Sequence, residues 1–360
     1  MPSPTLISLD AMGGDHGPPV VVGGIADYLK RHGGEGVRFL VHGDEALIGA
    51  EMKRLGLSAD RCVVRHTDKM IAMDEKPAQA MRRGKGSSLW NAIECVKTGE
   101  AGAVVSAGNT GALMAISKLL LRMSVPGLDR PAIVASWPTP KGVTAVLDVG
   151  ANIESDAAQL VEFAIMGEAF MTAVHGVQKP KIGLLNVGSE DMKGHEEVRE
   201  AARLLRDGGF GLDYYGFVEG TDIAKGTVDV VVTDGFTGNI ALKTAEGVAK
   251  FIAGLMKEAL TSSITSKMGA LLAMPALKRM SQKIDPNANN GGPLLGLNGI
   301  VVKSHGGATP GGYGAAIRVA VELARSDYME KVGANLQRLT ALLENPIVNS
   351  AEEPAGESIQ

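Results

Sequence analysis

Short apolar runs recur along the chain and alternate with stretches in which apolar residues have helical spacing. Such runs, bounded by small or polar residues, are typical of buried strands. The clearest runs are 6–9, 37–42, 103–105, 132–136, 144–147, 182–185 and 228–232. Helical spacing is found at 76–98, 111–123, 155–174, 195–207 and 239–260. The alternation predicts βαβ units and a mostly parallel sheet, in a Rossmann-like α/β fold with helices on both faces.

The residues that directly follow the strands are the first place to look for function, because ligands of open parallel sheets bind beyond the carboxyl ends of strands. Five of these strand ends are rich in Gly, Asn, Asp, Ser and Thr. They are residues 10–18, 106–111, 148–152, 186–194 and 233–239.

Composition narrows the class of protein. The 360 residues include 47 glycines and carry a formal charge of −4, without the basic excess of a nucleic-acid-binding protein. The two cysteines have no zinc or disulfide spacing, and no metal site or cofactor is expected. No secretory signal and no apolar run of membrane-spanning length is found, so we expect a cytoplasmic protein.

Residues 1–344 are predicted to form one catalytic domain, and the polar tail 345–360 is expected to be disordered.

The segment 106–111 is the clearest candidate phosphate site. A glycine-rich turn that leaves a strand and opens a helix directs several backbone N–H groups and the helix dipole to one spot. The candidate ligands are Ser106, Gly108, Asn109 and Thr110. A plain N-cap would use the same residue types. The segment fits neither a Walker A motif nor the dinucleotide fingerprint.

The other strand ends supply further candidates for substrate binding. Gly13 and Gly14 allow a close backbone approach, and Asp10 and Asp15 are placed either to bind a substrate or to cap backbone amides. His305 lies in a second glycine-rich loop, where a buried structural histidine is the commoner case.

Two more segments offer charge and amide donors. In 186–194, Lys193 is placed to neutralise phosphate or a developing oxyanion, although a surface lysine paired with acids is the usual case. In 233–239, the backbone amides and the Asn side chain at the start of a helix are placed to donate hydrogen bonds to an oxygen atom. The alternative is that the segment only caps the helix. The remaining candidates in these two segments are Asn186, Glu190, Asp234, Thr237, Gly238 and Asn239.

No nucleophile stands out in the sequence. Neither a Ser-His-Asp order nor a GxSxG elbow is present, and no cysteine has the setting of a nucleophile. A transferase that lacks a covalent nucleophile would work by positioning and electrostatics, with phosphate itself as the attacking group.

Residues 260–298 interrupt the βαβ rhythm and are predicted to form a helical hairpin insertion. Between residues 259 and 284 there are four basic residues and no acidic one. An apolar, basic, Met-rich helix suits an anionic membrane surface, and a hairpin in a dimer interface is the alternative. Pro275 is expected to kink or split the helix. The residues predicted to meet the membrane are Leu271, Leu272, Met274, Leu277, Lys278 and Arg279.

Taken together, six blocks resemble the PlsX family of phosphate acyltransferases. They read DAMGGD at 10–15, SAGNTGALM at 106–114, LDVGAN at 147–152, TDGFTGN at 233–239, PLLGLNG at 293–299 and KSHG at 303–306. The blocks follow one another in order over almost the whole chain, from about residue 5 to residue 330.

The resemblance implies that inorganic phosphate attacks the thioester of a long-chain acyl-acyl carrier protein, giving acyl phosphate for glycerol-3-phosphate acyltransferase. It implies a fold similar to that of isocitrate and isopropylmalate dehydrogenases, a homodimer, and peripheral membrane contact through the hairpin. It places Lys193 and Asn239 at the catalytic positions and gives no role to His16. Asp191 stands where the family often has Glu.

Three other functions are compatible with parts of the pattern. A relative that uses acyl-CoA, such as a phosphate acetyl- or butyryltransferase, would share the phosphate loops. A nicotinamide-dependent decarboxylating dehydrogenase would share the architecture, but it needs a dinucleotide fingerprint and an acidic metal cluster that the sequence lacks. A non-catalytic membrane scaffold would need only the hairpin.

Overall fold

A computed structural model describes residues 4–124, 130–284, 290–333 and 337, with the backbone alone at 278–284. Within these residues one 11-stranded sheet has the order β3-β2-β1-β4-β11-β10-β5-β6-β9-β7-β8. The strands are β1 (Thr5–Asp10), β2 (Val37–Gly43), β3 (Cys62–His66), β4 (Ala103–Ser106), β5 (Ala132–Thr139), β6 (Gly142–Leu147), β7 (Lys181–Leu185), β8 (Asp213–Val218), β9 (Val230–Val232), β10 (Gly292–Leu295) and β11 (Ile300–Lys303).

The sheet consists of two parallel blocks joined by antiparallel strands. The first half comprises β3, β2, β1, β4 and β11, and the second half comprises β6, β9, β7 and β8; neighbours within each half are parallel. Between them, the pairs β11–β10, β10–β5 and β5–β6 are antiparallel. Three reversals leave the two halves running in opposite directions along the sheet.

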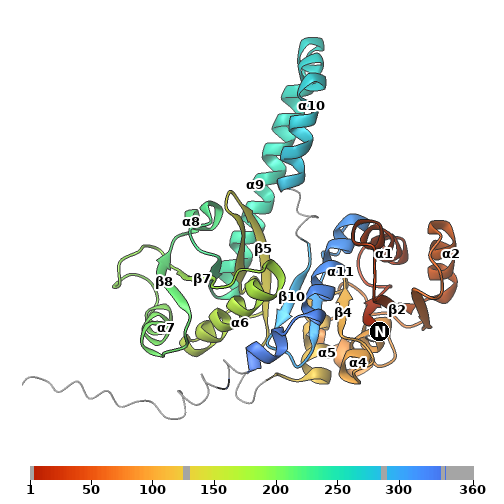
Figure 1. The fold of residues 1–360 in the computed structure, drawn as a ribbon, viewed down its shortest axis with the longest axis horizontal. Helices are drawn as coiled ribbons and strands as arrows, with labels where there is room; N and C mark the ends of the chain where they lie inside the picture. Colours follow the sequence, from red (N-terminus) through yellow and green to blue (C-terminus); the bar gives the residue numbers. More distant parts are fainter. Residues whose placement is uncertain (1–3, 125–129, 285–289, 334–336, 338–360) are drawn as a thin grey trace, which may run out of the picture.

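Helices cover both faces of the sheet, as Figure 1 shows. The helices α1, α2, α6, α7 and α11 lie over one face, and α4, α5, α8 and the start of α9 lie over the other. The helices are α1 (Pro18–His32), α2 (Glu45–Leu55), α3 (Pro77–Arg83), α4 (Ser88–Lys97), α5 (Thr110–Leu121), α6 (Ala157–His175), α7 (Glu196–Asp207), α8 (Gly220–Lys225), α9 (Gly235–Thr261), α10 (Ile264–Ile284) and α11 (Pro310–Arg325).

Two hydrophobic clusters fill the space between the sheet and its helices. Successive strand side chains point to opposite faces, so Val105 packs in the α1/α11 cluster and Val104 in the α4/α5 cluster. Helix α6 alone among the described helices is long and apolar enough to cross a membrane, but 61% of its apolar window is buried against the sheet. It is therefore a core helix of this fold.

The predicted α/β class with a mostly parallel sheet is confirmed. One helical stretch differs, because residues 76–98 form two helices and not one. Gly86 has a φ of +82°, a left-handed conformation that breaks the helix. The side chain of Ser87 then caps α4 by accepting a hydrogen bond from the Trp90 N–H at 3.2 Å.

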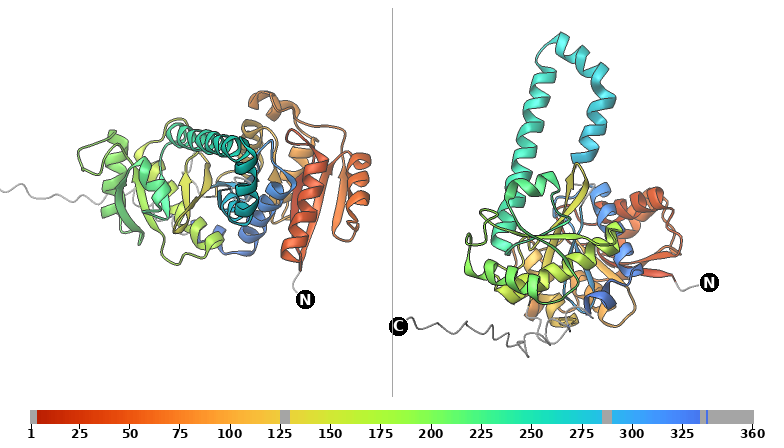
Figure 2. Two further views of the ribbon diagram at one scale, coloured as in Figure 1. Left: turned by 90° about the horizontal axis from the view of Figure 1, so that it is seen from above. Right: turned by 60° about the vertical axis from the view of Figure 1, so that its left-hand side comes forward.

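Helices α9 and α10 form an antiparallel hairpin that projects away from the body (Figures 1 and 2). At 1.5 Å per residue, the 27 residues of α9 extend about 40 Å. The hairpin does not coincide with the predicted insertion 260–298, because its first arm begins at Gly235 and residues 292–295 already belong to the sheet as β10. The tail 345–360 lies outside the described residues.

Glycine fixes the starting point of α9. A Cβ atom on Gly238 would overlap the carbonyl oxygen of Asp148, and one on Gly235 would lie 2.7 Å from the Asp148 Oδ2 atom. The N–H of Gly235 donates to the carbonyl oxygen of Asn152 at 2.7 Å. The first turn of α9 therefore packs backbone against backbone on the loop that follows β6.

Replacing Gly238 by Ala tests this contact. We expect the free energy of unfolding to fall by about 1–3 kcal/mol or more, because an added methyl group has no room. Gly254→Ala is the matched control in the same helix, where nothing lies within 4 Å of the new Cβ. It should raise the free energy by about 0.5–1 kcal/mol through helix propensity. Urea unfolding followed by circular dichroism measures both, and equal stability of the two variants would contradict the packing.

Candidate active site

The first cluster of predicted residues gathers at the carboxyl ends of β1, β4 and β11. Ser106 donates a hydrogen bond from Oγ to Oδ2 of Asp10 at 2.7 Å, and both side chains are buried. Burial raises the pKa of the Asp10 carboxyl, while hydrogen bonds from Ser88 and Ser106 oppose that shift. The N–H of Gly108 donates to Ser106 Oγ at 3.0 Å. Asp10 and Ser106 therefore act first as the frame on which the two loops are shaped.

Glycines let the three loops of this cluster touch through their backbones. A Cβ on Gly13 would lie 2.7 Å from the nitrogen of Gly108. One on Gly14, whose φ is +90°, would lie 3.0 Å from the carbonyl oxygen of Gly306. The N–H of Asp15 donates to that same oxygen at 2.9 Å, and the Asp15 side chain is exposed. The loops after β1, β4 and β11 thus form one close-packed cradle.

Asn109 performs the capping role that was the alternative to phosphate binding. Its Oδ1 accepts from the Ala112 N–H at 3.0 Å and caps α5. Its Nδ2 donates to the carbonyl oxygens of Met73 and Glu75, both at 2.8 Å. The side chain is therefore engaged within the protein. Thr110 is the first residue of α5 and is partly buried.

Lys303, at the end of β11, belongs to this cluster although the sequence analysis did not select it. Its Nζ donates to the carbonyl oxygen of Ala107 at 3.2 Å and to that of Ser304. A signal was present, because Lys303 ends the otherwise apolar strand Ile300–Lys303 and so occupies a strand end like the other candidates.

The second cluster gathers at the carboxyl ends of β6, β9 and β7, and its centre is Asp148. The buried Asp148 carboxylate accepts from the N–H groups of Ile133 at 3.0 Å, Ala151 at 3.0 Å and Asn152 at 2.6 Å. The side-chain amide of Asn152 adds a bond at 2.9 Å. Burial raises the pKa of Asp148, and these donors oppose the shift. Both residues were part of a sequence block but were not selected, and they shape the loop on which α9 rests.

The start of α9 carries the next group of candidates. Asp234 caps the helix, its carboxylate accepting from the N–H of Thr237 at 2.8 Å and from its Oγ1 at 2.7 Å. Asn239 lies one turn further on, exposed beside Gly150. Within the described residues its side-chain amide makes no hydrogen bond to the protein. Asn239 is therefore free to bind a ligand.

The loop 186–194 follows β7, the strand next to β9. Asn186 shapes the loop, with Nδ2 donating to the carbonyl oxygen of Lys193 at 2.9 Å. The Lys193 Nζ lies 2.8 Å from Oε1 of Glu190, and both side chains are about half exposed. This lysine holds the pKa of Glu190 below its usual value. Because Leu184 of β7 pairs with Val232 of β9, the loop begins beside the start of α9.

Helix α9 connects the two clusters. Asn239, Lys243 and Glu246 are spaced four and three residues apart and so share one helix face. Nε2 of His305, in the loop after β11, lies 3.2 Å from Oε1 of Glu246. The two halves of the sheet run in opposite directions, yet α9 brings residues of the second half against the cradle of the first. Among the predicted residues whose side chains the structure describes, His305 is the one in direct contact with the opposite half.

Ser106 of the first cluster and the two cysteines of the chain are not placed to act as nucleophiles. Ser106 is completely buried. Burial raises the pKa of Cys62 and of Cys95 to about 11 each, which keeps both as thiols. Cys62 lies on β3 and Cys95 on α4, within the hydrophobic clusters. Over all the residues that the structure describes, no group of three or more His, Cys, Asp or Glu residues is placed to hold a metal ion.

Known proteins resemble this chain over most of its length. A family model described as fatty acid synthesis protein matches residues 5–331. A phosphate acyltransferase of Caulobacter vibrioides is 66% identical over 336 residues, which cover 93% of this chain and 92% of the relative. A phosphate acyltransferase of Phenylobacterium zucineum is 59% identical over 340 residues, covering 94% and 95%.

Solved structures show the same fold at low identity. A phosphotransacetylase from Streptococcus pyogenes superposes with a TM-score of 0.59 and 20% identity, over 90% of this chain and 95% of that one. A branched-chain phosphotransacylase from Enterococcus faecalis has a TM-score of 0.55 and 15% identity, over 89% and 99%. At these identities the likeness concerns the fold. The relatives of high identity confirm the resemblance of the six sequence blocks, and the chain belongs to the PlsX family of phosphate acyltransferases.

Proposed function

We propose that this enzyme transfers a long-chain acyl group from acyl-acyl carrier protein to inorganic phosphate, giving acyl phosphate and free acyl carrier protein. The observation that carries the proposal is the pairing of two strand-end clusters by α9. One is a cradle of glycine backbone, and the other presents Lys193 and Asn239 with exposed side chains. Family membership supports the reaction type.

Direct attack by phosphate is the second part of the proposal. A phosphate oxygen forms the new bond to the thioester carbon, the carbon–sulfur bond breaks, and the carrier protein leaves as a thiolate. The role of the enzyme is to hold the two substrates together and to stabilise the oxyanion that develops on the carbonyl. Asn239 and Lys193 are the proposed oxyanion donors. The buried state of Ser106, Cys62 and Cys95 supports a route without an acyl-enzyme.

The activity test combines long-chain acyl-acyl carrier protein with phosphate and traps acyl phosphate with hydroxylamine. Lys193→Ala and Asn239→Ala should each lower kcat by about a hundredfold, because each removes an oxyanion donor. Lys179→Ala, an exposed lysine near the start of β7, is the control and should keep full activity.

Four results would contradict parts of the proposal. Failure of wild-type enzyme to form acyl phosphate would reject the reaction, and turnover of acetyl-CoA in place of the carrier-protein donor would favour a phosphate acetyltransferase. Full activity of Lys193→Ala would remove that residue from the site. Parallel lines in double-reciprocal plots of initial rates would indicate a covalent acyl-enzyme, since direct attack gives intersecting lines.

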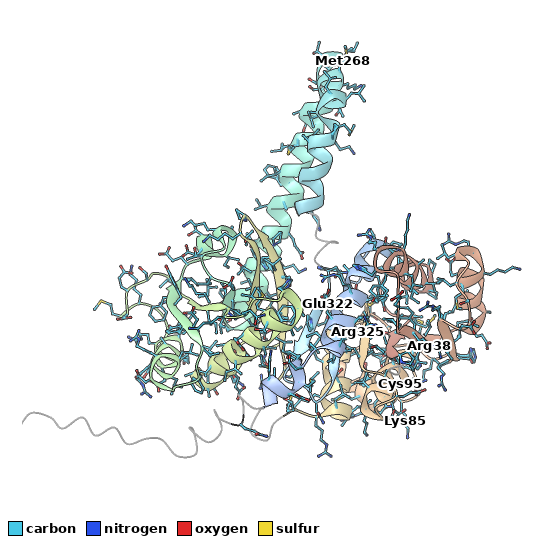
Figure 3. The ribbon with its side chains drawn as sticks, viewed as in Figure 1. Arg38, Lys85, Cys95, Met268, Glu322 and Arg325 are labelled. Atoms are coloured by element: carbon cyan, nitrogen blue, oxygen red, sulfur yellow. The ribbon has the colours of Figure 1, made fainter. Side chains whose placement is uncertain are left out.

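The hairpin is proposed to serve peripheral membrane contact and dimer formation in a cytoplasmic enzyme. Its outer part exposes Ile264, Met268, Leu271 and Leu272, with Leu272 85% exposed. Met268 lies near the far end of the hairpin (Figure 3). Exposed apolar surface of this kind marks an interaction site. Contact with an anionic membrane would place the enzyme where its product is consumed by glycerol-3-phosphate acyltransferase.

The lower part of the hairpin is proposed to contact a second copy of the chain. One face of α9 carries three apolar side chains that are each at least half exposed, Val248, Phe251 and Ile252. Their spacing of three and four residues places them side by side on the helix. Among the other predicted membrane residues, Met274 is 52% exposed and Leu277 is partly buried. The side chains of Lys278 and Arg279 lie outside the described residues.

Vesicle sedimentation tests the membrane proposal. The double variant Leu271→Ser/Leu272→Ser should bind vesicles that contain phosphatidylglycerol at least about tenfold more weakly, because two apolar side chains no longer enter the interface. Leu47→Ser on α2 removes a leucine that is 52% exposed elsewhere and should leave binding unchanged. Unaltered binding by the double variant, or no binding by wild-type enzyme, would reject the membrane role. Turnover retained by the double variant would show that binding is accessory and would exclude a pure scaffold.

A further inference from the structure

Lys303 stands in a row of polar residues that crosses the first half of the sheet. In the parallel pairing, Lys303 is opposite Ser106, Ser106 is opposite Asp10, and Asp10 is opposite His42. Residues paired in this way point to the same face, here the face covered by α4, α5 and the start of α9. Lys303 is the one lysine in this row, and its strand β11 is the member of the row nearest to the second half of the sheet.

The contacts of Lys303 hold its amine at the junction of the loops. Nζ donates to the carbonyl oxygens of Ala107 and Ser304, which belong to the loops after β4 and β11. An ammonium group has three N–H donors. Two are used by these carbonyls, and within the described residues no protein acceptor is found for the third. The cradle therefore contains a fixed cation with one N–H remaining for a ligand.

The charges that face Lys303 come from both halves of the molecule. Asp10 and Asp15 lie on the side of β1, and Lys243 of α9 acts on Lys303 from the other half. Lys243 Nζ is itself paired with Oε2 of Glu246 at 3.1 Å, and the other oxygen of Glu246 lies 3.2 Å from Nε2 of His305. Burial and the Lys243 charge lower the pKa of Lys303 to about 8, while Asp10 and Asp15 act in the opposite direction. Lys243 is exposed and lies one turn beyond Asn239, about 6 Å along the helix axis.

A purely structural role does not account for this arrangement. A lysine that only joined two loops would leave its third N–H without an acceptor, which is unfavourable for a partly buried ammonium group. Lys303 lies beside glycine-rich loops, and the contact of Glu246 with His305 brings the Lys243 face of α9 to the loop after β11. The two lysines are suited to a shared anion there. Burying the amine costs stability, as is common where a functional site holds a charge in a fixed place.

We propose that Lys303 is a substrate-binding residue whose Nζ contacts the phosphate, with Lys243 completing the contact from α9. This inference rests on the proposed function for the identity of the anion. It adds the residues that bind the attacking substrate, whereas Lys193 and Asn239 were assigned to the carbonyl oxygen. It also gives α9 a role in closing the site, because one anion would hold the helix against the loop after β11.

The first test measures the binding of inorganic phosphate alone by isothermal titration calorimetry, at fixed pH and with no acyl donor. Lys303→Met should raise the Kd for phosphate by about 10- to 100-fold, as expected for loss of a charge-assisted hydrogen bond. Lys303→Arg keeps the charge and should recover part of the affinity. Lys53→Met, which removes an exposed lysine of α2, is the control and should bind phosphate like wild type.

The second test uses pH and distinguishes binding from a structural role. The protonated amine binds the anion, so affinity should be full below about pH 8 and decline as pH rises through that value. Lys243→Met removes a repelling charge and should move the decline to higher pH. Asp15→Asn removes an attracting charge and should move it to lower pH. The ionisation of phosphate itself is the same in every titration and cancels in the comparison.

The outcomes separate this inference from the proposed function. Wild-type affinity in Lys303→Met, or a decline whose pH is the same in Lys243→Met and Asp15→Asn, would overturn the role of Lys303. If Lys303→Met does not fold, Lys303→Arg and the two pH-shift variants decide the question. Phosphate binding without formation of acyl phosphate would reject the proposed reaction and leave Lys303 as an anion-binding residue. Acyl phosphate formation by Lys303→Met with an unchanged KM for phosphate would leave the reaction and reject Lys303.

Discussion

Close backbone contact between strand-end loops is the constraint on which the rest of the structure depends. The loop after β1 lies against the loops after β4 and β11 at Gly13 and Gly14, and the start of α9 lies against the loop after β6 at Gly238. A side chain at any of these positions would separate the segments. Because the segments touch through peptide groups, backbone N–H groups are concentrated at these loops, an arrangement that suits an anion.

Polar side chains in the two clusters serve mainly to hold that backbone in place. Asp148 gathers the N–H groups of its own loop, Asp234 caps α9, and Asn109 caps α5 while its amide holds residues 73–75. A residue type that suggests ligand binding is thus used for architecture in these three cases. Within the described residues, the amide of Asn239 and one N–H of Lys303 have no protein acceptor, whereas the amine of Lys193 is paired with Glu190.

Helix α9 connects two groups of strand ends that the sheet topology alone would keep apart. The antiparallel strands in the middle of the sheet make the two halves run in opposite directions, so strand direction alone does not bring their carboxyl ends to one edge. The helix begins in the second cluster at Asp234 and passes the first cluster at Lys243 and Glu246. Its continuation forms the hairpin, so the same element links the two clusters to the exposed apolar surface outside the body.

The sequence by itself determined the α/β class, the main strands and helices, the glycine-rich strand ends and, through six blocks, the family. Local signals suffice there, because hydrophobic periodicity and turn residues act over a few neighbouring positions. The tertiary structure decided which strand ends meet, and so which of their side chains bind protein groups and which keep a donor for a ligand. Asn109 and Lys303 show the physical reason. Whether an amide or an ammonium has a free N–H depends on carbonyl groups far away in the chain. Lys303 and Ala107 are 196 positions apart, and no local pattern includes both.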